Sequence, residues 1–246
     1  MRRHVPCVRV MTVRGKTRFV ESALLSRLSE EERRGLLAIA RRRRFKRREV
    51  VFHDGDPGDA LHLVSRGHVA IRITTPLGDI ATLRVIAPGE FFGELALIAD
   101  APRRGSAVAM DEVETMSVHR EQLDALRESH PWVDRVLIEA LATEVRRLAS
   151  RLVEALYTPV EQRVWLRLAE LTAMFGHPDA ASVMIPLTQD ELAQIVGTTR
   201  PTVNRVLRTA EESGVVQLRR GRLEVLKPVD VTAHSKAPPG TDSTRS

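Results

Sequence analysis

Short apolar runs alternate with turn residues between residues 49 and 118, which predicts a domain built from β-strands. Glycine, proline and aspartate separate the runs, most clearly at 55–59 and 76–79. Eight short strands at this spacing are typical of a small antiparallel barrel or jelly roll. The expected strands are 50–52, 61–64, 69–73, 80–86, 91–92, 95–98, 107–109 and 115–118.

The pattern becomes helical on both sides of this region. Ser29 and Glu32 form a capping-box pattern at the start of a helix that we expect to reach residue 40. After residue 119, apolar residues recur in alternating steps of three and four. A buried core helix is the alternative, but this spacing favours a seam between two paired helices. The expected seam residues are Ile138, Leu141, Val145, Leu148 and Leu152.

The last third of the chain has the pattern of a helix, a tight turn and a second helix. Thr188 and Glu191 form a capping box before a short apolar-faced helix, and Gly197 then permits a turn with positive φ. The second helix is expected over 199–212, with Pro201 in its first turn. Two strands, 215–218 and 223–226, follow and enclose an Arg-rich hairpin tip. This order predicts a winged helix-turn-helix.

The polar face of the second helix carries the side chains that read base edges. An arginine bonds the O6 and N7 atoms of guanine, and an asparagine can do the same to adenine. Threonine hydroxyls at a helix start bond phosphate, and arginines at a hairpin tip are suited to the DNA backbone. The candidate DNA-contacting residues are Thr188, Thr199, Arg200, Thr202, Asn204, Arg205, Arg208 and Arg220.

Composition narrows the alternatives. The chain has 246 residues, a formal net charge of +6 and 43% hydrophobic residues, so an acidic polymer such as DNA is a natural partner. The single cysteine, Cys7, excludes a disulfide framework, a thiolate zinc cage and a four-cysteine iron–sulfur cluster within one chain. We expect a reducing, cytoplasmic location. No apolar stretch is long enough to span a membrane, so no membrane contact is expected.

These motifs, in this order, resemble the Crp/Fnr superfamily of bacterial transcription regulators. The resemblance covers residues 19–227 and is most specific over 187–205; the stretches 55–59, 65–67, 88–97 and 102–104 add to it. It implies an α+β chain with an antiparallel β-roll sensor of the cyclic-nucleotide-binding, jelly-roll type, a long dimerisation helix and a C-terminal winged helix-turn-helix. The expected parts are a basic flexible tail at 1–20, the sensor domain at 21–130, the dimerisation helix at 131–157, the DNA-binding domain at 158–228 and a disordered tail at 229–246.

The resemblance also implies where an effector would bind. The family's nucleotide cassette is similar to Gly93, Glu94 and Leu95 followed by Arg103 and Arg104, with Ser106 nearby. Either arginine aligns with the phosphate ligand, and the next position is not the usual Ser or Thr. Counting back from Arg163 places Leu148 and Ala149 where the family meets the base with a hydroxyl. Cyclic AMP or another cyclic nucleotide is therefore one candidate cofactor, and a different effector or none is the other.

The function that we expect is sequence-specific DNA binding by a homodimer on a palindromic operator, with RNA polymerase as a further partner. Pro201 replaces the family's acidic base contact, which predicts a changed half-site. The alternatives are a ligand-independent DNA binder, a cupin-like metal enzyme and a regulatory module for a partner enzyme. No catalytic motif and no metal site stand out, so we expect no enzyme. Haem is disfavoured, although His53, His62, His68 and His119 occur in the sensor region.

Overall fold

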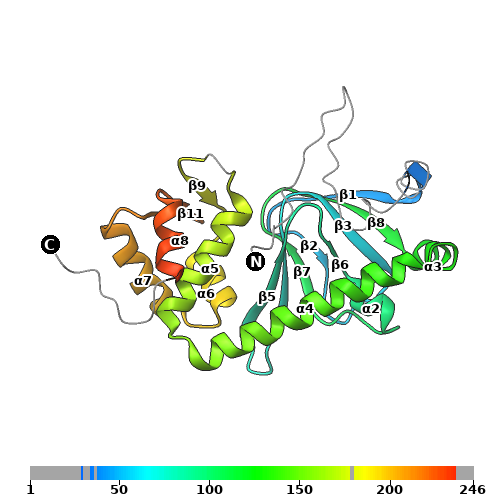
Figure 1. Cartoon of the computed structure of the whole chain (residues 1–246), viewed down its shortest axis with the longest axis horizontal. Coiled ribbons are helices and arrows are strands. Elements are labelled where there is room, and N and C mark those ends of the chain that lie inside the picture. Colours follow the sequence, from blue (N-terminus) through cyan, green and yellow to red (C-terminus); the bar gives the residue numbers. More distant parts are fainter. Residues whose placement is uncertain (1–28, 30–33, 36–37, 178–179, 237–246) are drawn as a thin grey trace, which may run out of the picture. The chain divides into compact units, whose positions relative to one another are not determined.

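The computed structural model describes residues 29, 34–35, 38–177 and 180–236 (Figure 1). The chain forms two compact units, one within 1–73 and 83–143 and the other within 74–82 and 144–246. The predicted tail at 1–20 lies outside the described residues, as does most of the helix expected before residue 40.

The first unit is built on two antiparallel four-stranded sheets, ordered β1-β8-β3-β6 and β2-β7-β4-β5. This arrangement confirms the expected β-roll. Its strands are β1 Arg41–Phe45, β2 Val50–Phe52, β3 Ala60–Arg66, β4 Val69–Thr74, β5 Ile80–Ile86, β6 Phe91–Phe92, β7 Ser106–Ala109 and β8 Val113–His119.

Strand β3 is buried on both of its faces. Leu61 and Leu63 belong to one apolar cluster, together with Val133 and Val136 of the following helical region. Val64, on the opposite face of the strand, packs in a second cluster with Phe92. Burial on both faces explains why this strand is a nearly continuous apolar run rather than an alternating one.

In this unit one predicted element was wrong in type, and one strand was not predicted. Residues 95–98, expected as a strand, belong to helix α2, Glu94–Ile98. The preceding Gly93 has φ 90, a left-handed conformation that ends β6 and turns the chain into a helix. Strand β1 was not expected, because four consecutive arginines precede Phe45. It pairs with β8, where Glu114 forms ion pairs with Arg42 and Arg44.

Two helices follow the β-roll: α3, Arg120–Ser129, and α4, Trp132–Tyr157. The first turns of α4 bury Val133, Val136 and Leu137 against the sheet residues of the first unit. Among the described residues, no helix is both long and apolar enough to cross a membrane.

The second unit contains the predicted helix-turn-helix and wing. Its elements are α5 Val160–Phe175, β9 Val183–Ile185, α6 Gln189–Val196, α7 Arg200–Glu212, β10 Val216–Arg219, β11 Arg222–Val225 and α8 Pro228–Lys236. The three strands form one antiparallel sheet in the order β10-β11-β9. The two-residue loop between β10 and β11 contains Gly221 at φ 72.

The predicted disordered tail was wrong for residues 229–236, which form most of helix α8. Val231 is completely buried, and the ring of His234 stacks on Trp165 of α5 with centroids 4.5 Å apart. The side-chain amide of Gln162 donates to the carbonyl oxygens of His234 and Ser235 at 3.2 and 2.8 Å. A polar composition hid these few specific contacts. Residues 237–246 lie outside the described residues.

Candidate DNA interface and sensor site

Helix α6 begins at the capping box that the sequence predicts. The hydroxyl of Thr188 accepts from the backbone amide of Glu191 at 3.2 Å, and the amide of Thr188 donates to the Glu191 carboxylate at 2.8 Å. These two bonds satisfy donors that a helix start leaves unpaired. Both the threonine hydroxyl and the first turn of α6 are thereby held in place.

The turn after α6 is also as predicted. Gly197 has φ 72 and ψ 52, the left-handed conformation that closes many helices. Thr199 occupies the N-cap position of α7, but its hydroxyl bonds the hydroxyl of Thr202 at 3.0 Å rather than a backbone amide. Thr199 therefore makes no side-chain cap bond to the backbone of α7, and the residue is exposed.

Helix α7 presents the expected basic face. Val203, Val206 and Leu207 are buried, which fixes the rotation of the helix about its axis. The opposite side carries the candidate DNA contacts: Arg200, Arg205 and Arg208 are exposed, and Thr202 and Asn204 are half-buried. The arginine side chains thus lie where a major groove would be met.

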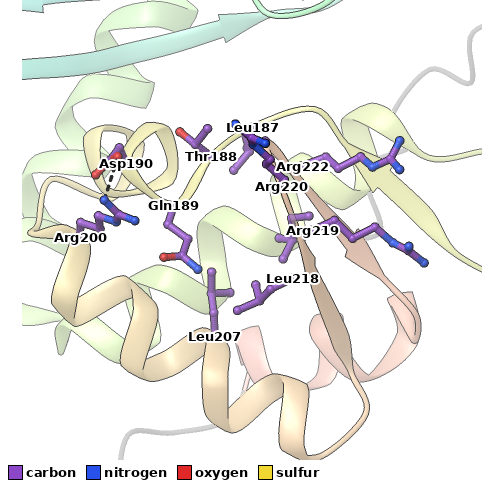
Figure 2. A pocket seen from close by; sticks show the side chains of 12 residues that line it. Leu187, Thr188, Gln189, Asp190, Arg200, Leu207, Leu218, Arg219, Arg220 and Arg222 are labelled. Atoms are coloured by element: carbon purple, nitrogen blue, oxygen red, sulfur yellow. Dashed lines mark ion pairs between the residues drawn. The ribbon is translucent and has the colours of Figure 1, made fainter.

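A groove of about 270 Å³ lies between the start of α6, helix α7 and the wing (Figure 2). The structure brings three predicted residues to it: Thr188, Arg200 and Arg220. Its apolar lining comes from Leu187, Leu207, Leu218 and Leu223, and its other polar residues are Gln189, Asp190, Arg219 and Arg222. The remaining predicted contacts, Thr199, Thr202, Asn204, Arg205 and Arg208, are not among the groove's lining residues.

Sequence reasoning missed Asp190 as a member of this site. Its carboxylate lies 3.7 Å from the Arg200 guanidinium, and both side chains are largely exposed (Figure 2). The capping-box pattern indicated a helix start at this position, but nothing in it indicated an approach to a residue ten positions further along.

In the first unit, the candidate effector residues gather around Arg103. Its Nη1 donates to the carbonyl oxygen of Gly93 at 2.8 Å, and its Nη2 donates to that of Ala60 at 2.6 Å. A side chain at Gly93 would place its Cβ 2.6 Å from Nη1 of Arg103, and the φ of 90 is one that other residues rarely adopt, so glycine is strongly favoured here. Asp59 lies 3.5 Å from Nη2. Gly93 thus permits the close approach of the Arg103 guanidinium to the backbone.

The structure separates the two arginines between which the sequence could not choose. The Arg103 residue is 3% exposed, whereas Arg104 points outward. Burial lowers the pKa of the Arg103 guanidinium, and Asp59 opposes that shift. The Arg103 cation is therefore the fixed one, and Nε of Arg103 is buried without a hydrogen-bond partner.

The other members of the predicted cassette have different environments. Glu94 is buried beside this cluster, in the first turn of α2. Leu95 is 54% exposed, so its side chain faces away from the core of the β-roll. The Ser106 hydroxyl accepts from the backbone amide of Asp54 at 3.0 Å, a bond that holds the neighbouring turn.

An aromatic wall adjoins Arg103, and the sequence reasoning did not identify it. The guanidinium carbon lies 4.2 Å from the ring centroid of Phe52, and His62 stacks on Phe92 at 5.1 Å. Burial, and then the charge of Arg103, lowers the pKa of His62 to about 3. His62 is therefore neutral at ordinary pH. The described residues hold no group of three His, Cys, Asp or Glu side chains that could bind a metal ion.

The predicted seam on α4 forms an apolar stripe. Ile138, Val145, Leu148 and Leu152 are exposed large hydrophobic residues in the single chain, and Leu141 is half-buried. The stripe continues through Val153 and Leu156, which are also exposed. An apolar stripe of this length on one helix is a surface suited to burial against a partner.

A sheet-built sensor unit followed by a winged helix-turn-helix defines a class of DNA-binding regulator, and the comparisons agree. Residues 42–130 match the family model of the cyclic nucleotide-binding domain, and residues 146–230 match that of the Crp-like helix-turn-helix domain. The chain is 34% identical over 176 residues to the CRP-like cAMP-activated global transcriptional regulator of Mycobacterium tuberculosis, covering 71% of this chain and 79% of that relative.

Two solved structures are similar to the chain. The catabolite activator protein of Thermus thermophilus is 33% identical, with a TM-score of 0.51 and coverage of 87% of this chain and 98% of that chain. The c-di-GMP responsive global regulator CLP of Xanthomonas campestris is 25% identical, with a TM-score of 0.64 and coverage of 77% and 95%. The chain therefore belongs to the Crp/Fnr family and is a DNA-binding transcription regulator with a cyclic-nucleotide-binding domain.

Proposed function

We propose that the protein acts as a homodimer that reads a two-fold symmetric operator through α7 and is controlled through the β-roll. The observation that carries this proposal is the helix that follows the Gly197 turn. It buries Val203 and Leu207 and directs Arg200 and Arg205 outward. This is the geometry of a recognition helix, whose first residues contact base edges in the major groove.

Pairing through α4 supplies the second half of the proposal. Burial of the stripe that includes Val145 and Leu152 against a second copy would hold two α7 helices together. Successive major grooves on one side of B-form DNA are about 34 Å apart, so a dimer of this kind recognises two half-sites at that spacing. The operator is then a palindrome.

Base recognition rests on Arg200 and Arg205, with Asn204 between them. Each arginine can bond one guanine, and Thr199, Thr202, Arg208 and Arg220 contact phosphate or sugar and fix the register. Pro201 can accept no base contact through its side chain. We therefore propose a half-site that differs from the family's common one at the base pair that an acidic residue would read.

For control, we propose an anionic effector of the cyclic-nucleotide class, held by Arg103 with Glu94 on the ribose. Relatives are named for a response to cAMP or to c-di-GMP, so cAMP is the first ligand to test. A second candidate is ligand-independent DNA binding. It is favoured by the carbonyl oxygens of Gly93 and Ala60, which already bond both terminal nitrogens of Arg103.

The remaining parts of the proposal follow from that function. A regulator of this kind acts by contacting RNA polymerase and performs no catalysis of its own. It works where the chromosome is, in the cytoplasm.

The test is affinity selection of random duplexes by the full-length protein, with and without cAMP. The proposal expects a palindromic consensus, with arginine-read guanines in each half-site and tighter binding when cAMP is present. The same consensus with unchanged affinity would favour the ligand-independent candidate. Recovery of no shared sequence at moderate salt would overturn the recognition role of α7.

A further inference from the structure

Helix α5 contains an arginine whose charged group is completely enclosed by protein. Arg167 is 1% exposed and is the largest fully buried side chain in the described part of the chain. Its Nη1 bonds both carboxylate oxygens of Glu170 at 2.8 Å, and its Nη2 is ion-paired with Glu154 of α4. A buried guanidinium is tolerated when several of its donors are bonded in this way.

The ion pairs cross between α4 and α5 at two levels. Glu154 meets Arg167 at one level, and Arg151 meets Glu170 at 2.7 Å at the other. Three residues back along α4 correspond to three residues forward along α5, which is the register of an antiparallel helix pair. Burial raises the pKa of the Glu154 carboxyl. The four side chains form one connected network.

A second arginine continues the connection toward the DNA-reading helix. Arg163 lies one turn before Arg167 on α5, and its Nη1 donates to the carbonyl oxygen of Val196 at 3.2 Å. Val196 is the last residue of α6, directly before the Gly197 turn that leads into α7. Helix α5 is thus bonded to the seam-bearing half of α4 and to the turn before the recognition helix.

We propose that Arg167 is a positioning residue that fixes α5, and with it α7, relative to the paired α4 helices. This inference rests on the proposed homodimer, because the spacing of two α7 helices has meaning only when α4 is paired. Apolar contacts between helices are non-directional and permit small shifts, whereas a buried guanidinium bonded on two sides has one satisfactory arrangement. The network would therefore set which half-site spacing the dimer accepts.

The experiment measures spacing preference rather than affinity alone. Operators with the selected half-sites are prepared at the preferred centre-to-centre distance and with one base pair added or removed. Binding of the full-length protein to each is compared with binding to a duplex that carries one half-site. The variants are Arg167→Met, which keeps the length of the side chain without its charge, and Glu154→Gln, which weakens one ion pair with little change in shape.

We expect wild type to discriminate against the altered spacings by about tenfold, the effect of one lost base contact. Arg167→Met should reduce that discrimination to about twofold or threefold, with single-half-site binding retained, because an unrestrained α7 adapts to either spacing. Glu154→Gln should fall between the two. Arg135→Met, which removes an exposed ion pair to Glu139 on the same helix α4, should behave as wild type.

The outcomes separate this inference from the function on which it rests. A wild-type protein with no preference for paired half-sites would overturn the proposed dimeric recognition itself. A sharp wild-type preference that persists in both folded variants would overturn the role of Arg167 alone. If Arg167→Met is unfolded by circular dichroism, Glu154→Gln decides the question by the same comparison.

Discussion

At the scale of single residues, the proposed DNA interface assigns its arginines to two tasks. Arg200 lies at the start of α7, where we propose that base edges are contacted, and Arg220 lies in the wing loop between β10 and β11. A base contact carries sequence information, whereas a backbone contact adds affinity to every sequence equally. The two positions therefore make a matched pair.

Arg200→Ala should weaken binding to the selected operator by about 1–3 kcal/mol and relax the preference at one base pair of each half-site. Arg220→Ala should weaken specific and nonspecific binding alike and reduce the salt dependence of the binding constant by about one unit of slope. Competition titrations over a range of salt concentrations measure both effects. Equal loss of preference in the two variants would contradict the division of tasks.

His62 makes the stability of the sensor unit depend on pH. Its folded-state pKa of about 3 lies below the usual value of 6.5, so the unfolded chain binds the extra proton between these values. Stability is therefore unaffected above pH 6.5 and falls as pH is lowered from there toward 3. His62→Phe, which keeps a ring beside Phe92, should remove a slope of about 1 kcal/mol per pH unit near pH 5. Urea unfolding at pH 7 and pH 5 checks this; identical slopes in both proteins would refute it.

At the scale of single residues, the sequence predicted only some of the residues that form the two sites. It identified Arg103 and Arg104 as alternatives, but the choice depends on which side chain of two neighbours in an extended segment points inward. It missed Asp190 and the ring of Phe52, because their partners, Arg200 and Arg103, are distant in the sequence and close only in the folded chain. Chemistry carried by a local pattern, such as the Thr188 capping box, was predicted completely.

At the scale of elements, the least expected feature is α8. Its sequence shows no apolar periodicity, yet Val231 is fully buried while Val229, two residues earlier, is 80% exposed. One ring stack and two hydrogen bonds from the Gln162 side chain attach the helix to α5, and Val231 is its buried apolar side chain. Such sparse anchoring leaves almost no trace in a hydrophobic pattern.

Val231→Ala should lower the free energy of unfolding of the second unit by about 1–2 kcal/mol, because it removes two buried methyl groups. Val229→Ala is the control from the same helix and should change stability by less than about 0.5 kcal/mol. Thermal unfolding of both variants is followed by tryptophan fluorescence in a Trp132→Phe background, where Trp165 is the only remaining tryptophan. Equal stability of the two variants would mean that burial of Val231 does not stabilise this unit.

Errors in element type had a similar physical origin. The run at 95–98 is apolar enough for a strand, but the left-handed Gly93 starts a helix there. The arginines of β1 are poor strand candidates by composition, and Glu114 on β8 makes the pairing favourable. In both cases the local structure depends on a residue outside the apolar or basic run itself: Gly93 for residues 95–98, and Glu114 for β1.

At the scale of the whole molecule, the order of parts was predicted from the sequence, and the matched ranges 42–130 and 146–230 agree with it. The predicted limits of the domains stay predictions. At this scale, the apolar stripe on α4 allows the proposed pairing of two chains to be tested. A charge placed in the seam should separate two chains, because an unpaired charge is costly to bury.

Leu152→Glu should convert the dimer to a monomer and abolish preference for paired half-sites, while binding to one half-site persists at higher protein concentration. Val229→Glu places the same charge on an exposed position and should leave the dimer intact. Sedimentation velocity measures the oligomeric state. Dimers of undiminished stability in Leu152→Glu would show that the seam lies elsewhere.

The hydrogen bonds from Arg103 to two backbone carbonyl oxygens bear on which effectors the proposed sensor could bind. Because Gly93 and Ala60 each accept a hydrogen bond from one terminal nitrogen, an effector that replaced these bonds would gain only the difference between its own attraction and the bonds that it displaces. Under the same proposal, we expect a neutral nucleoside of the same shape to bind more weakly, because it offers the guanidinium no negative charge. On the proposed function, the effectors best able to replace these two hydrogen bonds are those that bring a negative charge to Arg103.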